Sequence, residues 1–472
     1  MSLDPVERSH LVLLFAQAAR LALFVAATAF LGRRLGADDF AFVALVTTSF
    51  VLAQGALDMG TSTVAVVRVS RWRESERGVL ATLIGWRRMV GFALAAGFAL
   101  AAVASGPQAR GTALAAAALA CLVLPYSAYA VTYSVRQAFA AAMAVGLAVQ
   151  VAFLAGCVAL VHVGLGGAAI ATLVAAREAI NAWATRLIGA PLAGGPVSPQ
   201  GFGVDMRTLL ASALPFGVAA LACRLAYSAG TFFLWFEGPE ALAPYAAAER
   251  LLSPLQDLAW LFAMPFAATL GAAAARSQSA LRSEMAARLL FMAGLGAVGA
   301  VLGVALAPAV VELMYAGRYG SGGGATIDAF RWLSLGMGIA AATPVLAMTE
   351  VACHRERELL AIGGTVLAAS LVLNAWWIPR FGAQGAAAAA ATTSAIVTGA
   401  LATKAIARGD LAWGWDSLPY FAPAALALAT LPWMGGSPWI QVLAGAALAL
   451  ATPFVLRRLP EQRAARGEVH AA

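Results

Sequence analysis

Four arginines lie within long apolar stretches of the chain, where a charge is unusual: Arg20, Arg177, Arg224 and Arg250. A guanidinium stays charged at any working pH and can hold a phosphate or carboxylate through two parallel hydrogen bonds. In a bilayer such a charge costs about 2.5–3.5 kcal/mol on insertion scales, so it is expected to face a partner or a wet cavity. These arginines are therefore our first candidates for binding an anion, and two or more of them would suit a pyrophosphate.

Carboxylates form a second set within the same stretches: Asp58, Glu178, Glu249, Asp257 and Glu350. Two interpretations stay open for them. They can neutralise the arginines and hold helices together, as the adjacent pairs Arg177–Glu178 and Arg250–Glu249 suggest. Alternatively, a carboxylate in a cavity can carry a coupling Na⁺ or H⁺, because burial raises the pKa of a carboxyl group. The candidates for coupling are Asp58, Glu249 and Asp257.

Polar residues around Asp58 share one side of a predicted helix. Thr47, Gln54, Asp58 and Ser62 follow one another at steps of seven, four and four, which places them on one helical face. Gln54 therefore joins the arginines as a candidate binding residue. Glu350 lies near the end of a predicted span, where we expect it to be solvated.

The composition identifies the elements that must position these residues. The 472 residues are 61% hydrophobic and 11% charged, with a mean hydropathy of +0.81. Soluble chains carry about 25% charged residues, whereas a membrane span needs about 20 apolar ones. We therefore expect an all-α integral membrane protein with about fourteen spans, at 11–31, 40–66, 88–104, 111–133, 139–161, 165–188, 208–235, 244–273, 288–314, 325–352, 359–378, 383–403, 418–434 and 438–456.

The distribution of basic residues predicts the topology. With a cytoplasmic N-terminus, 21 of the 31 basic residues fall on the cytoplasmic side and six on the outer side. Such an excess is the positive-inside pattern, and it places both termini in the cytoplasm. The arginine-rich segment 68–88 is interpreted as a topogenic loop, with a short interfacial helix on anionic headgroups as the alternative. The net charge of +8 thus reflects topology and not nucleic-acid binding.

Two regions of the chain resemble one another. The residues around Phe30 match those around Phe233 at an offset of 203, and the glycine-rich segment 163–169 matches 381–387. At that first offset Arg20 lies opposite Cys223, next to Arg224. Six spans separate the copies, which predicts a parallel repeat. The expected domains are an N-lobe at 1–190, a cytoplasmic linker at 191–207, a C-lobe at 208–406, accessory spans at 407–456 and a basic cytoplasmic tail at 457–472.

A nucleotide-binding pattern, GxGxxG at 294–299, lies within an apolar span. It lacks the preceding strand and the acidic ribose partner of a true nucleotide fingerprint. Close helix packing is the better explanation. The four cysteines show no metal-ligand spacing, so we expect no metal site and no cofactor other than a coupling ion.

Several motifs, in order, resemble those of bacterial polysaccharide (O-antigen type) flippases of the multidrug/oligosaccharidyl-lipid/polysaccharide exporter superfamily. They are found at 30–40, 57–63, 214–217, 245–252 and 373–387, and the similarity covers about residues 10–406. The resemblance implies a V-shaped flippase of two lobes that moves undecaprenyl-pyrophosphate-linked oligosaccharide across the bacterial inner membrane by alternating access. It implies cationic cavity residues near Arg20, Arg224 and Arg250, and partners such as a glycan polymerase and other assembly proteins.

The alternatives differ in the chemistry they require. The additional pair of spans is similar to the lipid II flippase branch, where a groove carries the lipid tail. A drug or cation antiporter of the same superfamily should line its cavity with acids and aromatics. A membrane glycan polymerase or ligase would need a sizeable outer loop with catalytic residues, yet the longest predicted outer segment is 316–324. We therefore expect a transporter and not an enzyme.

Overall fold

The computed structural model describes residues 5–72, 75–136, 138–199, 201, 204–263, 266–316, 318, 324–353 and 355–411. The chain divides into two compact units, Met1–Ala246 and Ala247–Ala472. The predicted spans 418–434 and 438–456 and the basic tail at 457–472 lie outside the described residues. The predicted lobe boundaries stay a prediction.

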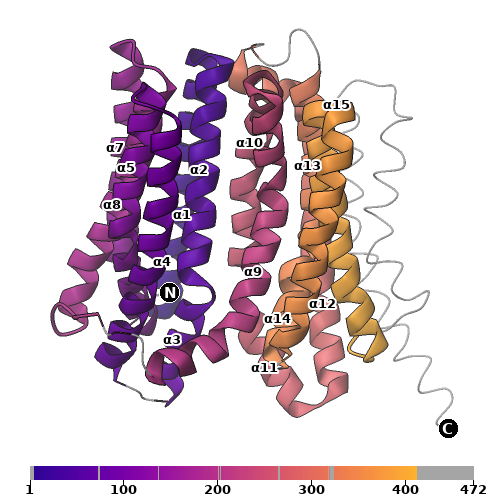
Figure 1. The fold of residues 1–472 in the computed structure, drawn as a ribbon. Coiled ribbons are helices and arrows are strands. Elements are labelled where there is room, and N and C mark those ends of the chain that lie inside the picture. Colours follow the sequence, from indigo (N-terminus) through magenta and orange to yellow (C-terminus); the bar gives the residue numbers. More distant parts are fainter. Residues whose placement is uncertain are drawn as a thin grey trace, which may run out of the picture. The chain divides into compact units, whose positions relative to one another are not determined.

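The first unit is a bundle of helices (Figure 1). Its elements are α1 (Pro5–Arg34), α2 (Ala37–Asp58), α3 (Thr61–Trp72), α4 (Glu76–Ala104), α5 (Ala109–Val123), the 3₁₀ helix η1 (Leu124–Tyr129), α6 (Ala130–Arg136), α7 (Phe139–His162), α8 (Gly167–Leu192), α9 (Val204–Glu237) and the start of α10 (Pro239–Ala263). Within this unit α1 packs on α7, α5 lies between α4 and α8, and α9 packs on α2 and α3.

The second unit contains the rest of α10 and five further helices. They are α11 (Phe266–Arg276), α12 (Gln278–Tyr315), α13 (Ala325–Ala340), α14 (Thr343–Ala352) and α15 (Glu356–Ala407). α13 packs between α12 and α15. α15 contains a break at Gly382, whose φ of 53° is not helical, so it represents the two predicted spans 359–378 and 383–403.

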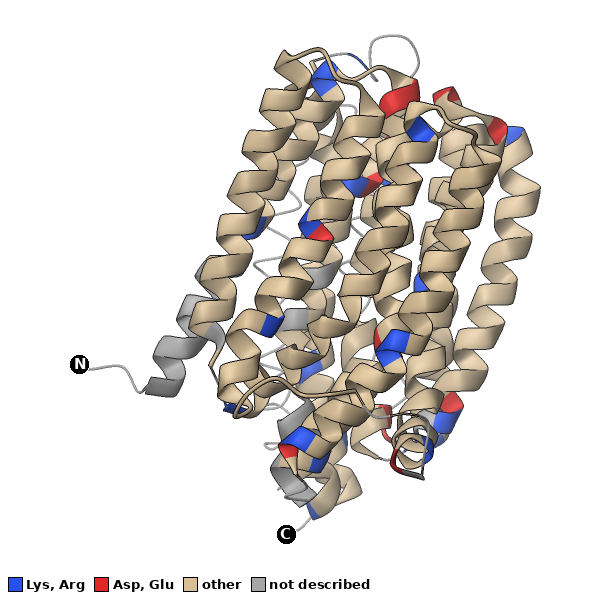
Figure 2. Ribbon diagram, turned by 60° about the vertical axis from the view of Figure 1, so that its left-hand side comes forward, with Lys and Arg blue, Asp and Glu red and all other residues tan. Residues whose placement is uncertain are grey.

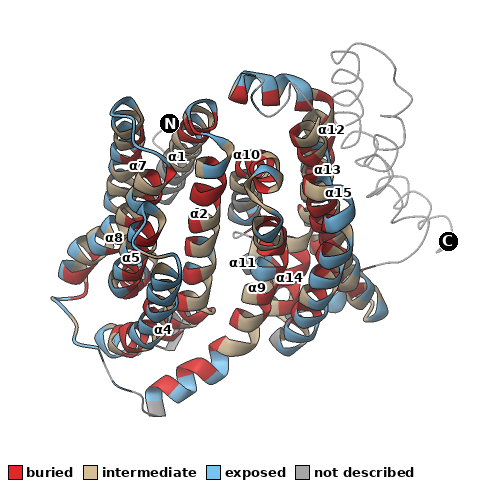
Figure 3. Cartoon of the chain, turned by 45° about the horizontal axis from the view of Figure 1, so that its top comes forward, coloured by how far each residue is buried: buried red, intermediate tan, exposed pale blue. Residues whose placement is uncertain are grey.

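The all-helical prediction is confirmed. Helices make up 91% of the described residues, which contain no strand. Eight of the described segments are long and apolar enough to cross a membrane, and the one at Arg357–Ala407 is 51 residues long. The helices bury one side and expose the other (Figure 3), as expected where part of each surface faces neighbouring helices.

The helix ends follow the repeat predicted from the sequence. α1 ends at Arg34 and α9 ends at Glu237, a spacing equal to the offset of 203. Gly164 and Gly382, paired at the second match, both adopt positive φ, at 80° and 53°. In each half the second span is two helices, α2 with α3 and α10 with α11. These correspondences support two sets of six spans.

The described residues of the segment 68–88 are mainly helical, and the span predicted at 88–104 begins earlier, at Glu76. α3 continues to Trp72, and α4 begins at Glu76 behind Ser75, whose Oγ accepts a hydrogen bond from the Gly78 N–H. Such an N-cap satisfies an otherwise unpaired donor at a helix start. Arg87, assigned from the sequence to the cytoplasmic loop, therefore lies inside α4, where it is buried.

Within the glycine pattern at 294–299, Gly296 serves helix packing, as predicted. A Cβ added at Gly296 of α12 would lie 2.3 Å from the backbone oxygen of Gly338 in α13. Only glycine allows this approach of two backbones.

Candidate functional site

α2 carries the polar residues on which the candidate site is built. Around residues 54–58 it contacts α8, α9 and α4, which are all in the first unit. Two groups of side chains meet there. We name them the Gln54 cluster, comprising Gln54, Phe153, Arg177 and Glu178, and the Asp58 cluster, comprising Asp58, Ser62, Arg87 and Ser127. Few charged residues lie within the helices, and some basic residues (blue) adjoin acidic ones (red) in Figure 2.

The Gln54 cluster contains a self-neutralised ion pair. Gln54 Nε2 donates to Glu178 Oε2 at 2.5 Å, and Arg177 Nε donates to Glu178 Oε1 at 2.9 Å. The Arg177 guanidinium also lies 4.8 Å from the centre of the Phe153 ring, a cation–π distance. The expected compensation of Arg177 by its neighbour Glu178 is confirmed.

Arg224 reaches the same turn of α2 from α9. Its Cδ lies 3.2 Å from the position that a Cβ of Gly55 would occupy, so the glycine makes room for the arginine stem. Gln54 and Gly55 are consecutive, and their contacts therefore lie at nearly one depth along α2. Arg224 is exposed, and no carboxylate among the described residues pairs with it. It is a surplus positive charge beside a neutral group.

The Asp58 cluster closes around a buried arginine. Arg87 Nη2 donates to Asp58 Oδ1 and to Ser62 Oγ, both at 2.6 Å, and Nη1 donates to Ser127 Oγ at 2.8 Å. Arg87 is 4% exposed and Asp58 is 42% exposed. One charge is thus withdrawn from solvent while its partner remains accessible.

The helical conformation is interrupted between α2 and α3 at this cluster. Met59 and Gly60 have φ values of 38° and 72°, which ends one helix and allows Ser62 to share Arg87 with Asp58. Gly217 of α9 packs directly on the break, because a Cβ there would lie 1.9 Å from the Met59 oxygen. The glycine of the motif at 214–217 therefore lets α9 lie against α2.

The remaining candidates are distributed over other helices. Arg20 is half-buried in α1, Arg250 is buried in α10, and Glu249 is half-buried beside it. All three are engaged in interactions. The side chain of Asp257 lies outside the described residues. The structure thus brings Gln54 and Arg177 together at Glu178 and places Arg224 against the next residue of α2, Gly55, whereas the roles of all the candidates stay predictions.

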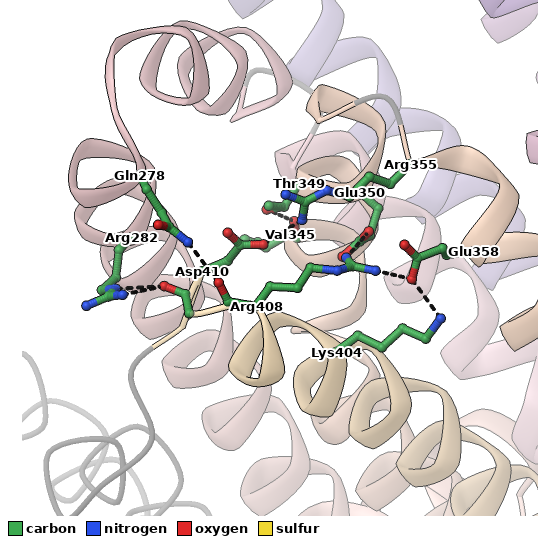
Figure 4. A network of polar contacts seen from close by, with 11 residues as sticks. Gln278, Arg282, Val345, Thr349, Glu350, Arg355, Glu358, Lys404, Arg408 and Asp410 are labelled. Carbon is green, nitrogen blue, oxygen red and sulfur yellow. Dashed lines mark hydrogen bonds and ion pairs between the residues drawn. The ribbon is translucent and has the colours of Figure 1, made fainter.

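A second ionic network lies in the second unit (Figure 4). Arg408 Nη1 donates to both carboxylate oxygens of Glu350, at 2.9 and 2.7 Å, and Arg408 also pairs with Glu358. We name this group the Glu350 network; its members are Arg282, Glu350, Arg355, Glu358, Lys404, Arg408 and Asp410. Glu350 is 2% exposed, so its predicted solvation is wrong. Arg408, directly after the last residue of α15, supplies the counter-charge.

Further hydrogen bonds between charged side chains hold the other members of the network. Lys404 Nζ donates to Glu358 Oε2 at 2.7 Å, and Arg355 Nη1 donates to Asp410 Oδ2 at 2.6 Å. This hydrogen bond to the Asp410 carboxylate raises the pKa of Arg355 above its ordinary value. Arg282 of α12 donates through Nε to the backbone oxygen of Gly409 at 2.8 Å. The network therefore joins α12, α14 and both ends of α15.

Neither Arg87 nor Arg408 was identified as a site residue from the sequence. Asp58 and Arg87 are 29 residues apart, and Glu350 and Arg408 are 58 apart. No helical spacing relates residues at such separations. The available signal for Arg87 was indirect, because the polar face with Asp58 and Ser62 lies in an otherwise apolar stretch and calls for a polar or charged partner.

No protein-family model matches the chain, and no curated protein matches it. Solved structures share its fold. The lipid II flippase MurJ, in an inward closed conformation, gives a TM-score of 0.67 at 12% identity, over 95% of this chain and 98% of that one. A mutant of the Vibrio cholerae MATE transporter VcmN gives 0.58 at 14% identity, over 85% and 96%.

A third structure is a multidrug/oligosaccharidyl-lipid/polysaccharide exporter (MOP) superfamily transporter from Pyrococcus furiosus, described as having a binding pocket of reverse polarity. It gives a TM-score of 0.57 at 12% identity, over 85% of this chain and 95% of that one. The apolar helices and these similarities lead to one conclusion. The chain is a multi-pass membrane protein with the fold of MOP superfamily transporters.

Proposed function

We propose that the protein is a flippase that moves an undecaprenyl-pyrophosphate-linked oligosaccharide across the bacterial inner membrane by alternating access. The observation that carries this proposal is Arg224, an exposed guanidinium within an apolar helix that no carboxylate among the described residues neutralises. A substrate phosphate would supply the missing counter-charge. Gln54 and the Arg177–Glu178 pair offer neutral hydrogen-bonding groups at the same depth of α2.

The sign of the charge favours an anion over a cationic drug. A cation antiporter needs free carboxylates in its cavity. In α2 and α8, however, Asp58 is paired with Arg87 and Glu178 with Arg177. The polar groups around residues 54–58 of α2 therefore carry one surplus positive charge, that of Arg224. Arg20 and Arg250 are proposed as further substrate-binding residues.

The lipid II flippase is the second candidate. It is favoured by a specific observation, because the lipid II flippase structure matches 95% of this chain with a TM-score of 0.67. Either function uses the same chemistry at Arg224, since a guanidinium binds a pyrophosphate in both cases. They differ in the glycan, and hence in which lipid-linked intermediate accumulates when the protein is absent.

Coupling to Na⁺ or H⁺ is part of the proposal, with Asp58, Glu249 and Asp257 as the candidates. The structure gives the contacts of Asp58. Its side chain is 42% exposed and lies at a helix break. An ion that displaced Arg87 from it would release the contact between α2 and α4.

A deletion strain tests the function directly. We expect the lipid-linked oligosaccharide to accumulate in the inner leaflet, and accumulation of lipid II instead would support the second candidate. Restoring the wild-type gene should reverse the accumulation, whereas Arg224→Ala should not. Arg331→Ala is the matched control, because Arg331 is an exposed arginine that pairs only with Asp328 among the described residues. Unchanged lipid-linked glycans together with new drug sensitivity would overturn the proposal.

A further inference from the structure

Arg186 of α8 is held between two aromatic rings. Its guanidinium carbon lies 4.5 Å from the centre of the Tyr126 ring and 4.7 Å from that of the Trp183 ring. The two rings meet edge to face, with their centres 5.7 Å apart at an interplanar angle of 83°. Aromatic faces attract a cation and restrict its position. The guanidinium is therefore fixed in place before any ligand arrives.

The aromatic contacts leave the hydrogen-bonding capacity of Arg186 unused. A guanidinium has five N–H donors, and the described residues provide no carboxylate for this one. Nearby arginines differ in this respect: Arg136 pairs with Glu76 at 2.9 Å, and Arg77 donates to the Gly194 oxygen at 2.8 Å. Arg186 thus combines a fixed position with free donors, which is what binding an anion requires.

The surroundings of Arg186 are apolar and exposed. Trp183 is 45% exposed, Leu187 61% and Ile180 54%, and their spacing places them on one face of α8. Arg186 precedes the last residue of α8, Leu192, by six positions, or about 9 Å along the axis. A long basic side chain at this depth can reach the headgroup level while its neighbours contact acyl chains.

We propose that Arg186, Trp183 and Tyr126 form a binding site for the phosphate of an anionic phospholipid, whose acyl chains lie along Ile180 and Leu187. The guanidinium donates to the phosphate oxygens, and the two rings keep it oriented toward the headgroup. The site is independent of the transported substrate. It acts on the lipid surrounding the protein and would exist for any transport function.

Quenching of tryptophan by brominated phospholipids tests this site in the full-length protein. The contribution of Trp183 is the difference in fluorescence quenching between the wild-type protein and Trp183→Phe in proteoliposomes. Brominated phosphatidylglycerol should quench Trp183 more than brominated phosphatidylcholine, corresponding to about a fivefold preference for the anionic lipid. Arg186→Gln should abolish the preference, and Arg186→Lys should keep part of it because the charge remains.

Arg110 provides a matched control. It also lies over two rings, those of Phe42 and Trp235, at 5.4 and 5.9 Å, but Asp38 lies 3.5 Å from its guanidinium. Arg110→Gln should leave the lipid preference at Trp183 unchanged. Equal quenching of wild-type Trp183 by both lipids, or a preserved preference in an Arg186→Gln protein of native thermal stability, would overturn the proposal.

Discussion

The Asp58 cluster and the Glu350 network each hold an arginine, but with different partners. In the Asp58 cluster, Arg87 is shared among one carboxylate and two serine hydroxyls, within helices of the first unit. In the Glu350 network, Arg408 is held by two carboxylates at helix ends of the second unit. The first arrangement leaves its carboxylate partly exposed, whereas the second buries Glu350 completely.

The difference indicates two uses of charge. The Glu350 network connects helix ends. Each of its three carboxylates pairs with Arg355, Lys404 or Arg408, and its fourth base, Arg282, donates to a backbone oxygen. The residues around 54–58 of α2 place neutralised groups next to one surplus cation, Arg224. We therefore expect substitutions in the network to affect stability, and substitution of Arg224 to affect substrate handling with little loss of stability.

The largest expected effect is that of Arg87→Ala. It removes the buried side chain that joins α2, α4 and η1, and loss of one partner of a buried pair costs about 3–5 kcal/mol. Because Asp58 is partly exposed and can be solvated, we expect the lower end, about 3 kcal/mol. The measurement is the thermal midpoint of the purified protein in detergent. An unchanged midpoint would show that the Asp58 cluster is not structural.

Gly217→Ala should destabilise the first unit somewhat less. The added Cβ would meet the Met59 oxygen, so α9 must move away from the break between α2 and α3. Overpacking of this kind costs about 1–3 kcal/mol. Gly271→Ala is the control, because a Cβ there meets nothing within 4 Å. Equal thermal midpoints for the two variants would contradict the close contact of α9 with α2.

Glu350→Gln should cost about 1–3 kcal/mol, the range for a buried hydrogen bond lost to a charged group. Its effect should be seen in hydrogen exchange of α14 and of both ends of α15, while α2 and α8 stay unchanged. Faster exchange of α2 would contradict the separate roles assigned to the two regions.

The smallest effect is expected for Arg331→Ala. Both Arg331 and Asp328 are exposed, and surface ion pairs contribute about 0–1 kcal/mol. Its thermal midpoint should stay close to that of the wild type. A loss as large as that of Glu350→Gln would show that ion pairs in this protein cannot be ranked by burial.

Much of this arrangement follows from the sequence, for physical reasons. Hydropathy locates the helices, and the offset of 203 correctly relates the helix ends Arg34 and Glu237. Arg177 and Glu178 are adjacent, so their pairing was predictable. The bonds of Arg87 and Arg408 were not, because they depend on how helices distant in the chain pack. The span predicted at 88–104 was placed too late, because the charges of residues 76–88 resemble those of a loop although α4 begins at Glu76.

We propose that Arg224 binds the anionic part of a lipid-linked substrate. The most direct test is flipping of a fluorescent undecaprenyl-pyrophosphate-linked oligosaccharide in proteoliposomes. Loss of a charged hydrogen bond, worth about 1.5–3 kcal/mol, predicts a rate about 10-fold to 100-fold lower for Arg224→Ala, partial activity for Arg224→Lys and wild-type activity for Arg331→Ala. Wild-type flipping by a stably folded Arg224→Ala protein would contradict the claim.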